Sequence, residues 1–248
     1  MTPLSAFRRT SALAGLAVLA AGTAIRAGSA LPVQHVYPVH TDITATVFWI
    51  GEPVGNGSTE NNAISAYDDL WERHYGGFDD YRKVRTYPYF PPFTPHENPF
   101  YLDVPYDDFF DSGDPRPDRS KVPWAAELAP QLAAARRAGQ PYSLMKNRWV
   151  KLWRTVDGRV RTCYGQVEDA GPYVYDDTNY VFSKTNARPA SKLANNAGMD
   201  VSPALRDCLG FSGVNNADNK LSWRFVDATA VPKGPWRLVV TARQVFWP

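Results

Sequence analysis

Residues 147–166 read NRWVKLWRTVDGRVRTCYGQ and carry a strong signal for paired strands. Two strand-like runs, 147–155 and 159–166, lie on either side of Asp157-Gly158. Asp-Gly between such runs favours the two-residue turn that joins antiparallel strands, because both positions of that turn require a positive φ. We therefore expect a β-hairpin here and a mainly β fold around it.

Further strands are expected on both sides of the hairpin. The run 43–50 is rich in β-branched and aromatic residues, which are typical of strands. Pro53 ends this expected strand, because proline cannot join a central ladder. Two more strand-like runs occupy 221–226 and 236–241. Together these segments predict a sheet built mainly from the C-terminal half of the chain.

Three helices are expected, at 65–75, 125–138 and 203–209. The last is the best defined. Ser202 is a natural N-cap, the proline at the first helical position has a suitable φ, and Gly210 stops the helix. Glycine also follows each of the other two segments.

Residues 1–30 have the pattern of a secretory signal peptide. Arg8 and Arg9 precede an apolar run at 12–25, and Gly28-Ser29-Ala30 follows it. The run is shorter than the about 20 apolar residues that a transmembrane helix needs. An uncleaved anchor is the alternative, and Sec and twin-arginine export both stay open. We predict a secreted protein, extracellular or cell-wall associated, without stable membrane insertion.

The chain that remains after residues 1–30 is nearly neutral. Residues 1–30 contain three of the 27 basic residues and no acidic residue, so 24 basic and 25 acidic residues remain, a formal net charge of −1. Such a balance gives no electrostatic footprint for nucleic acid. We expect one monomeric domain, 31–248, with an insertion at about 53–141 where glycine, asparagine and proline interrupt the chain.

Cys163 and Cys208 are the only cysteines. Export permits a disulfide, but two buried thiols remain equally possible from the sequence. The histidines are scattered and no C-x-x-C or H-x-x-x-H spacing occurs, so no metal site is expected. No cofactor fingerprint is present either.

Three motifs follow one another in order between residues 142 and 228. They are the hairpin NRWVKL…DGR, VEDAGPY at 167–173, and GMDVSPAL at 198–205, and WRFV follows at 223–226. This set resembles the double-psi β-barrel of the rare lipoprotein A family. The resemblance implies a six-stranded double-psi β-barrel with loop and helical insertions.

The segment GMDVSPAL also resembles the H-F-D-L-S of expansins and the H-F-D of family 45 endoglucanases, whose T-D-T-G parallels Glu168 to Gly171. These resemblances imply a polysaccharide or peptidoglycan partner. Two departures stand out. Asp169 and Asp200 are 31 positions apart, much farther than in the family, so 174–197 must form a loop or an inserted hairpin. The insertion after the first strand is also unusually long.

The resemblance assigns Asp200 as a catalytic acid, because glycoside cleavage needs a proton delivered to the leaving oxygen. Asp169 and Glu52 are the candidates for a second carboxylate. Each has a structural alternative. Asp200 can order the start of the helix at 203–209, Asp169 can order a turn, and Glu52 is offset from the Y-W-D of family 45 enzymes.

Aromatic residues supply the candidates for sugar binding, because flat rings stack on sugar faces. The alternative is that they fill a β core. The selected residues are Tyr67, Trp71, Tyr173, Tyr175 and Tyr180.

Three functions are consistent with these observations. The first is a glycan-cleaving enzyme, a glycoside hydrolase or a lytic transglycosylase, that acts on peptidoglycan or a β-linked polysaccharide by acid catalysis. The second is a non-catalytic, expansin-like binding module. The third is a structural envelope protein whose barrel has lost its groove.

Overall fold

The computed structural model describes residues 35–55 and 61–248. The predicted signal peptide lies outside these residues. In the described ranges, no helix combines the length and the apolar character needed to cross a membrane.

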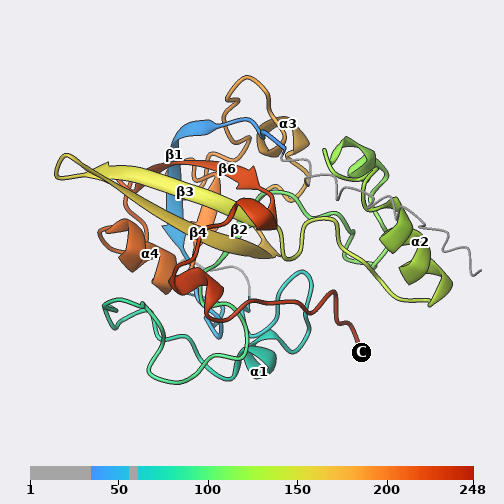
Figure 1. Cartoon of the computed structure of the whole chain (residues 1–248), viewed down its shortest axis with the longest axis horizontal. Helices are drawn as coiled ribbons and strands as arrows, with labels where there is room; N and C mark the ends of the chain where they lie inside the picture. Colours follow the sequence, from blue (N-terminus) through green and yellow to red (C-terminus); the bar gives the residue numbers. More distant parts are fainter. Residues whose placement is uncertain (1–34, 56–60) are drawn as a thin grey trace, which may run out of the picture. The chain divides into compact units, whose positions relative to one another are not determined.

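Six strands close into a barrel in the order β1-β5-β2-β4-β3-β6 (Figure 1). Two neighbouring pairs, β1 with β5 and β2 with β4, are parallel, and the other pairs are antiparallel. The strands are β1 (His40–Val47), β2 (Tyr101–Val104), β3 (Trp149–Val156), β4 (Arg159–Ala170), β5 (Met199–Val201) and β6 (Lys220–Val226). The predicted mainly β, six-stranded barrel is confirmed, and its mixed pairing is compatible with a double-psi β-barrel.

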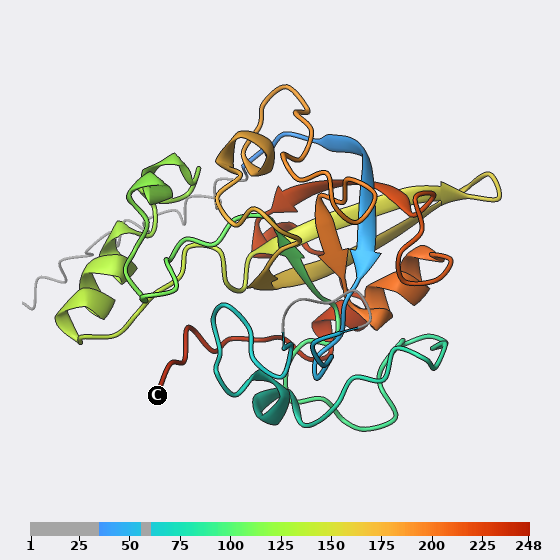
Figure 2. The same cartoon turned by 180° about the vertical axis from the view of Figure 1, so that it is seen from behind.

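The β3–β4 hairpin forms as the sequence predicts. The strands pair without interruption up to Val156 and Arg159, and Asp157 and Gly158 both have positive φ, 50° and 72°. The turn and the first residues of β4 are exposed, and the tip of the hairpin projects beyond the barrel (Figures 1 and 2). Farther along, Leu152 and Cys163 are fully buried in the core.

One expected strand is wrong. Residues 236–241 form no strand; a 3-10 turn, η3 (Pro235–Arg237), begins there instead. The barrel closes by pairing β6 with both β1 and β3, so no strand edge is left for this segment to join. Trp236 packs its ring against Tyr164 and Phe100.

The helices are short, and one is predicted residue for residue. α4 (Pro203–Leu209) begins at the Ser202 cap and ends at Gly210, which has φ 69°. The helix expected at 65–75 is reduced to its last turn, because Ser65 and Asp68 pair in an isolated bridge. The remaining helices are α1 (Trp71–Tyr75), α2 (Ala129–Arg137), α3 (Thr178–Val181), η1 (Pro117–Lys121) and η2 (Ala228–Ala230).

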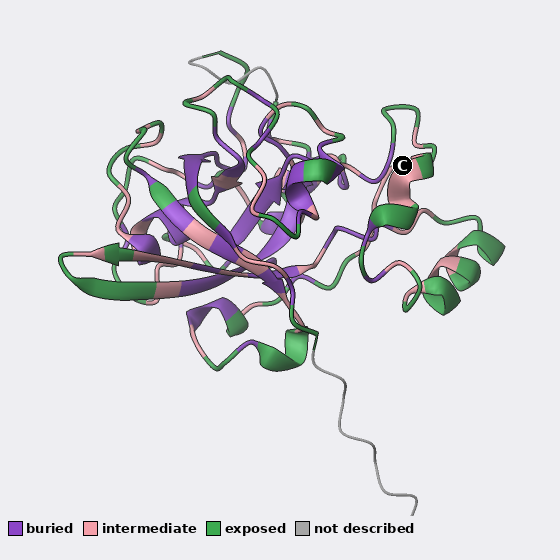
Figure 3. Ribbon diagram, turned by 90° about the horizontal axis from the view of Figure 1, so that it is seen from above, coloured by how far each residue is buried: buried purple, intermediate pink, exposed green. Residues whose placement is uncertain are grey.

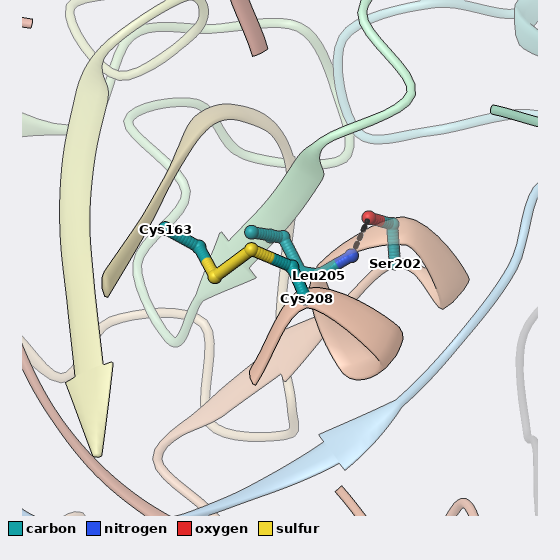
Figure 4. Close-up of a disulfide and its surroundings, with 4 residues drawn as sticks. All are labelled: Cys163, Ser202, Leu205 and Cys208. Carbon is teal, nitrogen blue, oxygen red and sulfur yellow. Dashed lines mark hydrogen bonds between the residues drawn. A yellow bond between two sulfur atoms is a disulfide. The ribbon is translucent and has the colours of Figure 1, made fainter. Parts of the chain in front are cut away.

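A disulfide joins β4 to α4. Cys163 and Cys208 are bonded, with their Cα atoms 6.4 Å apart. Figure 4 shows the bridge at Cys208, near the end of α4, together with the cap at its start, where the main-chain N–H of Leu205 donates to Oγ of Ser202 at 3.3 Å. The structure thus settles the alternative between a disulfide and two thiols, and it ties α4 to the barrel wall.

The predicted insertion at 53–141 is not a single insertion. It contains β2, whose four residues are all buried between β4 and β5. Buried positions follow the barrel strands for much of their length (Figure 3), whereas α2 has no buried residue. The segment is therefore divided into two excursions by a strand of the barrel.

Candidate active site

A pocket of about 150 Å³ lies at the carboxyl ends of β1, β2 and β4. Asp200, Asp169 and Glu52, the three acids selected from the sequence, all line it. A fourth carboxyl group, that of Asp103 on β2, lines it as well. Four carboxyl groups therefore share one small cavity.

The strand register explains why these groups meet. Asp103 lies opposite Asp200 on β5 and opposite Asp169 on β4, and Asp200 lies opposite Thr46 on β1. Residues opposite one another on adjacent strands point to the same face of a sheet. The four side chains thus form one row across four strands. The chain between Asp169 and Asp200, which are 31 positions apart, loops out and leaves both residues beside β2.

A break in register places Asp169 in this row. Leu102 pairs with Val167, but the next residue, Asp103, pairs with Asp169, so Glu168 is an extra residue in β4. Such bulges re-aim side chains and are common beside active sites. Glu168 instead forms a buried ion pair with Lys146, with 3.0 Å between Nζ and Oε2.

Asp200 has the environment of a proton donor. Burial, followed by the charges of Glu52 and Asp169, raises the pKa of Asp200 to about 8. The hydroxyl of Thr46 donates to its Oδ1. At neutral pH this carboxyl group is therefore largely protonated, although it keeps some exposure to the pocket.

Asp169 has a different set of hydrogen-bond donors. Its Oδ1 accepts the main-chain N–H groups of Ala66 and Ala170, each at 2.8 Å. Backbone donors stabilise the charged form of a carboxyl group. Asp169 thus accepts two main-chain donors on one oxygen, whereas Oδ1 of Asp200 accepts the hydroxyl of a side chain.

Glu52 reaches the pocket from the loop after β1. The side-chain amide of Asn62 donates to its Oε2 at 3.2 Å, and the main chains of the two residues are also bonded. Burial raises the pKa of Glu52 to about 7. Glu52 therefore lines the pocket even though its position in the sequence is offset from the Y-W-D of family 45 enzymes.

The five aromatic candidates divide into two groups. Tyr173 and Tyr175 line the pocket and are partly exposed. Tyr67, Trp71 and Tyr180 are buried in the core, with at most 1% of each exposed, which argues against their predicted stacking role. Another aromatic pair was not anticipated.

That pair is Trp49 and Tyr81. Trp49 lines the pocket and stacks on Tyr81, with 3.7 Å between the ring centroids. The two rings come from the segment directly after β1 and from the excursion before β2. They lie far apart in the sequence, so no local pattern predicts that they stack.

A second cavity, of about 560 Å³, shares a wall with the first. Asn62, Asp169, Ala170 and Tyr175 line both cavities, and Trp247 lies at the second. The two cavities therefore adjoin each other at Asp169 and the other shared lining residues.

Sequence reasoning missed Asp103, Thr46 and Asn62. Asp103 did carry a signal: it is a carboxylic acid inside the apolar run Tyr101–Val104, and aspartate is depleted in strands and rarely buried without a partner. Thr46 and Asn62 carried none, because threonine is ordinary in a strand and asparagine is ordinary in a loop.

Comparisons with protein-family models, with curated proteins and with solved structures found no match to this chain. The functional assignment of the chain therefore rests on the geometry of its pocket.

Proposed function

We propose that this protein is a secreted glycan-cleaving enzyme and that the carboxyl-lined pocket is its active site. One observation carries the proposal: Asp200, Asp169 and Glu52, selected separately from the sequence, line the same cavity. The resemblance to the rare lipoprotein A family and to family 45 endoglucanases supports the same function. The glycan is peptidoglycan or a β-linked polysaccharide.

Asp200 serves as the general acid and Asp169 as the general base. An acid and a base can work at one pH when their environments favour opposite protonation states. The raised pKa of Asp200 supports the acid role, since that group retains its proton near neutrality. The two main-chain donors at Oδ1 of Asp169 support the base role.

In the proposed step, the Asp200 carboxyl proton passes to the glycosidic oxygen while the bond from that oxygen to the anomeric carbon breaks. A water molecule attacks the anomeric carbon and gives one proton to Asp169. The products are two shorter glycans. Proton exchange with solvent then returns Asp200 and Asp169 to their starting states.

Inversion is the stereochemical outcome that we propose for hydrolysis. Asp169 and Asp200 lie on strands separated by β2, and two strand spacings place their main chains about 10 Å apart. Carboxyl groups about 6.5–9.5 Å apart accommodate a water molecule, whereas a retaining pair stands about 5–5.5 Å apart. Attack by a substrate hydroxyl, as in a lytic transglycosylase, needs only the acid.

The binding module remains the second candidate, and one observation favours it. Burial raises the pKa of Glu52 and of Asp200 as well as that of Asp103, so three of the four carboxyl groups tend to be neutral. A largely neutral pocket with a stacked Trp49–Tyr81 pair suits sugar binding without chemistry.

The deciding experiment incubates the protein from residue 31 onward with peptidoglycan, cellulose, mixed-linkage glucan and xylan. Product release is compared between wild type, Asp200→Asn and the exposed control Asp42→Asn. We expect release from at least one glycan, lost in Asp200→Asn and kept in Asp42→Asn. The stereochemistry of the new reducing end separates inversion from lytic cleavage.

Equal release by Asp200→Asn and wild type would refute the acid role. Retained pull-down on a glycan without any product would replace the enzyme by the binding module.

A further inference from the structure

Asp103 lies between Asp200 and Asp169 in the row of side chains across the barrel strands, and it takes no part in the proposed step. It is the one residue that lies opposite both Asp169 and Asp200. Its side chain is 3% exposed, and β2, the strand that carries it, is buried throughout. None of the ion pairs among the described residues includes Asp103.

The two carboxyl oxygens of Asp103 have different surroundings. Oδ1 accepts the main-chain N–H of Asp200 at 2.8 Å. Oδ2 lies against Gly171, where an added Cβ atom would come within 2.7 Å of it. Any side chain at position 171 would displace the Asp103 carboxyl group. This contact explains why a glycine, and not a residue with a side chain, stands at position 171 of the VEDAGPY motif.

We propose that Asp103 is a positioning residue that fixes the main chain of Asp200, and that its own protonation is coupled to that of Asp200. This role deepens the proposed function and rests on it where it concerns catalysis. The positioning and the coupling are properties of the free protein.

Physical chemistry supports the coupling. A buried carboxyl group without a cationic partner keeps its proton, because the charged form loses its hydration. Burial first, and then the charges of Asp200 and Asp169, raise the pKa of Asp103 well above its usual value. Two groups face it from the neighbouring strands, Asp200 from β5 and Asp169 from β4, while Glu52 acts on Asp200 from the loop after β1.

The consequence for chemistry is direct. Asp200 becomes a carboxylate when it gives up its proton, and a neutral Asp103 next to it adds no second negative charge. Since Oδ1 of Asp103 is occupied as an acceptor, the proton of Asp103 belongs on Oδ2. Asp103 itself touches no reacting atom in this scheme.

The test uses carboxyl-carbon NMR titration of the wild type, Asp103→Asn, Asp103→Leu and the exposed control Asp42→Asn. In the wild type, we expect the Asp200 carbon to sense the proton of Asp103 as a separate step, in addition to its own proton and to the charges of Glu52 and Asp169. Asp103→Asn keeps an oxygen acceptor for the Asp200 N–H but has no proton to lose. It should therefore remove the step that reports Asp103 from the Asp200 curve and leave the contributions of Glu52 and Asp169 in place.

The positioning is tested by amide hydrogen exchange. In Asp103→Leu the Asp200 N–H loses its acceptor, and we expect its exchange to become about tenfold faster. In Asp103→Asn its exchange should stay near that of the wild type. Gly171→Ala serves as a second variant that leaves Asp103 in place, and it should speed exchange of the same amide by displacing the carboxyl group.

Two results would overturn the inference: Asp200 titration curves that coincide in Asp103→Asn and wild type, or an unchanged Asp200 exchange rate in both Asp103→Leu and Gly171→Ala. Neither measurement needs a substrate. If no glycan is cleaved, the proposed function fails while the role of Asp103 is still decided. If a glycan is cleaved, Asp103→Asn should lower kcat and leave KM unchanged.

Discussion

Asp169 and Ala66 are joined by a hydrogen bond of 2.8 Å from the main-chain N–H of Ala66 to Oδ1 of Asp169. The bond fastens the loop after β1 to the end of β4, over 103 positions of sequence. The same loop carries Asn62, which holds Glu52. One carboxylate therefore shapes the pocket as well as lining it, and its two roles can be separated by substitution.

We expect Asp169→Asn to keep the loop in place and to lose the base. The amide oxygen of asparagine can still accept both main-chain N–H groups, whereas it cannot take a proton from water. General-base catalysis contributes about 10²–10⁴-fold, so kcat for glycan release should fall by that order. Asp169→Leu should in addition lower Tm. Asp169→Asn with full activity would exclude the base role.

Stability should fall as pH rises from 5 to 9. Burial raises the pKa of Asp200 to about 8 and those of Glu52 and Asp107 to about 7, against about 4 in the unfolded chain. Between these values the folded state holds more protons than the unfolded state. The stabilisation is therefore complete below about pH 4 and is lost as pH rises through about 7–8.

Thermal unfolding across this range provides the measurement. Asp200→Asn removes one of these groups, so its Tm should exceed that of the wild type at pH 9 by roughly 10–20 °C and match it near pH 4. Asp42→Asn, at an exposed position with a φ that asparagine accepts, is the control. A parallel pH dependence of Asp200→Asn and wild type would contradict the buried, protonated state of Asp200.

Loss of the disulfide should destabilise the fold. Cys163 and Cys208 are 45 positions apart, and closing a loop of that length restricts the unfolded chain by about 4 kcal/mol. For the double variant Cys163→Ala and Cys208→Ala we expect Tm to fall by roughly 8–16 °C. Reductant should lower the Tm of the wild type similarly and leave that of the double variant unchanged. A reductant-insensitive wild type would show that the bridge contributes nothing to stability.

Removing one partner of the buried ion pair between Lys146 and Glu168 should lower the stability of the fold strongly, whereas replacing both partners by apolar residues should lower it little. Both side chains are at most 1% exposed. Lys146→Met leaves Glu168 buried without its partner, which costs about 3–5 kcal/mol in comparable pairs. The double variant Lys146→Met with Glu168→Leu should regain most of that loss in urea unfolding. A double variant as unstable as the single one would mean that the packing around the pair, and not its charge, matters.

Local signals in the sequence were sufficient for much of the fold. Asp157-Gly158 predicts the β3–β4 hairpin, since the turn it favours matches strand twist. Ser202 and Gly210 predict both ends of α4, because caps satisfy main-chain groups within a few residues. The strand expected at 236–241 failed for the opposite reason: whether a run pairs depends on a free strand edge, which local sequence does not reveal.

The sequence by itself also predicted Asp200, Asp169 and Glu52, which are three of the four carboxyl groups that line the pocket. Only the tertiary structure decided which groups face them. The bulge at Glu168 aims Asp169 at Asp103, and the closure of the barrel puts β2 between β4 and β5. Strand order and register arise from the packing of the whole chain. The proton affinity of a carboxyl group depends on neighbours that lie far away in the sequence, such as Glu52, which is 148 positions from Asp200.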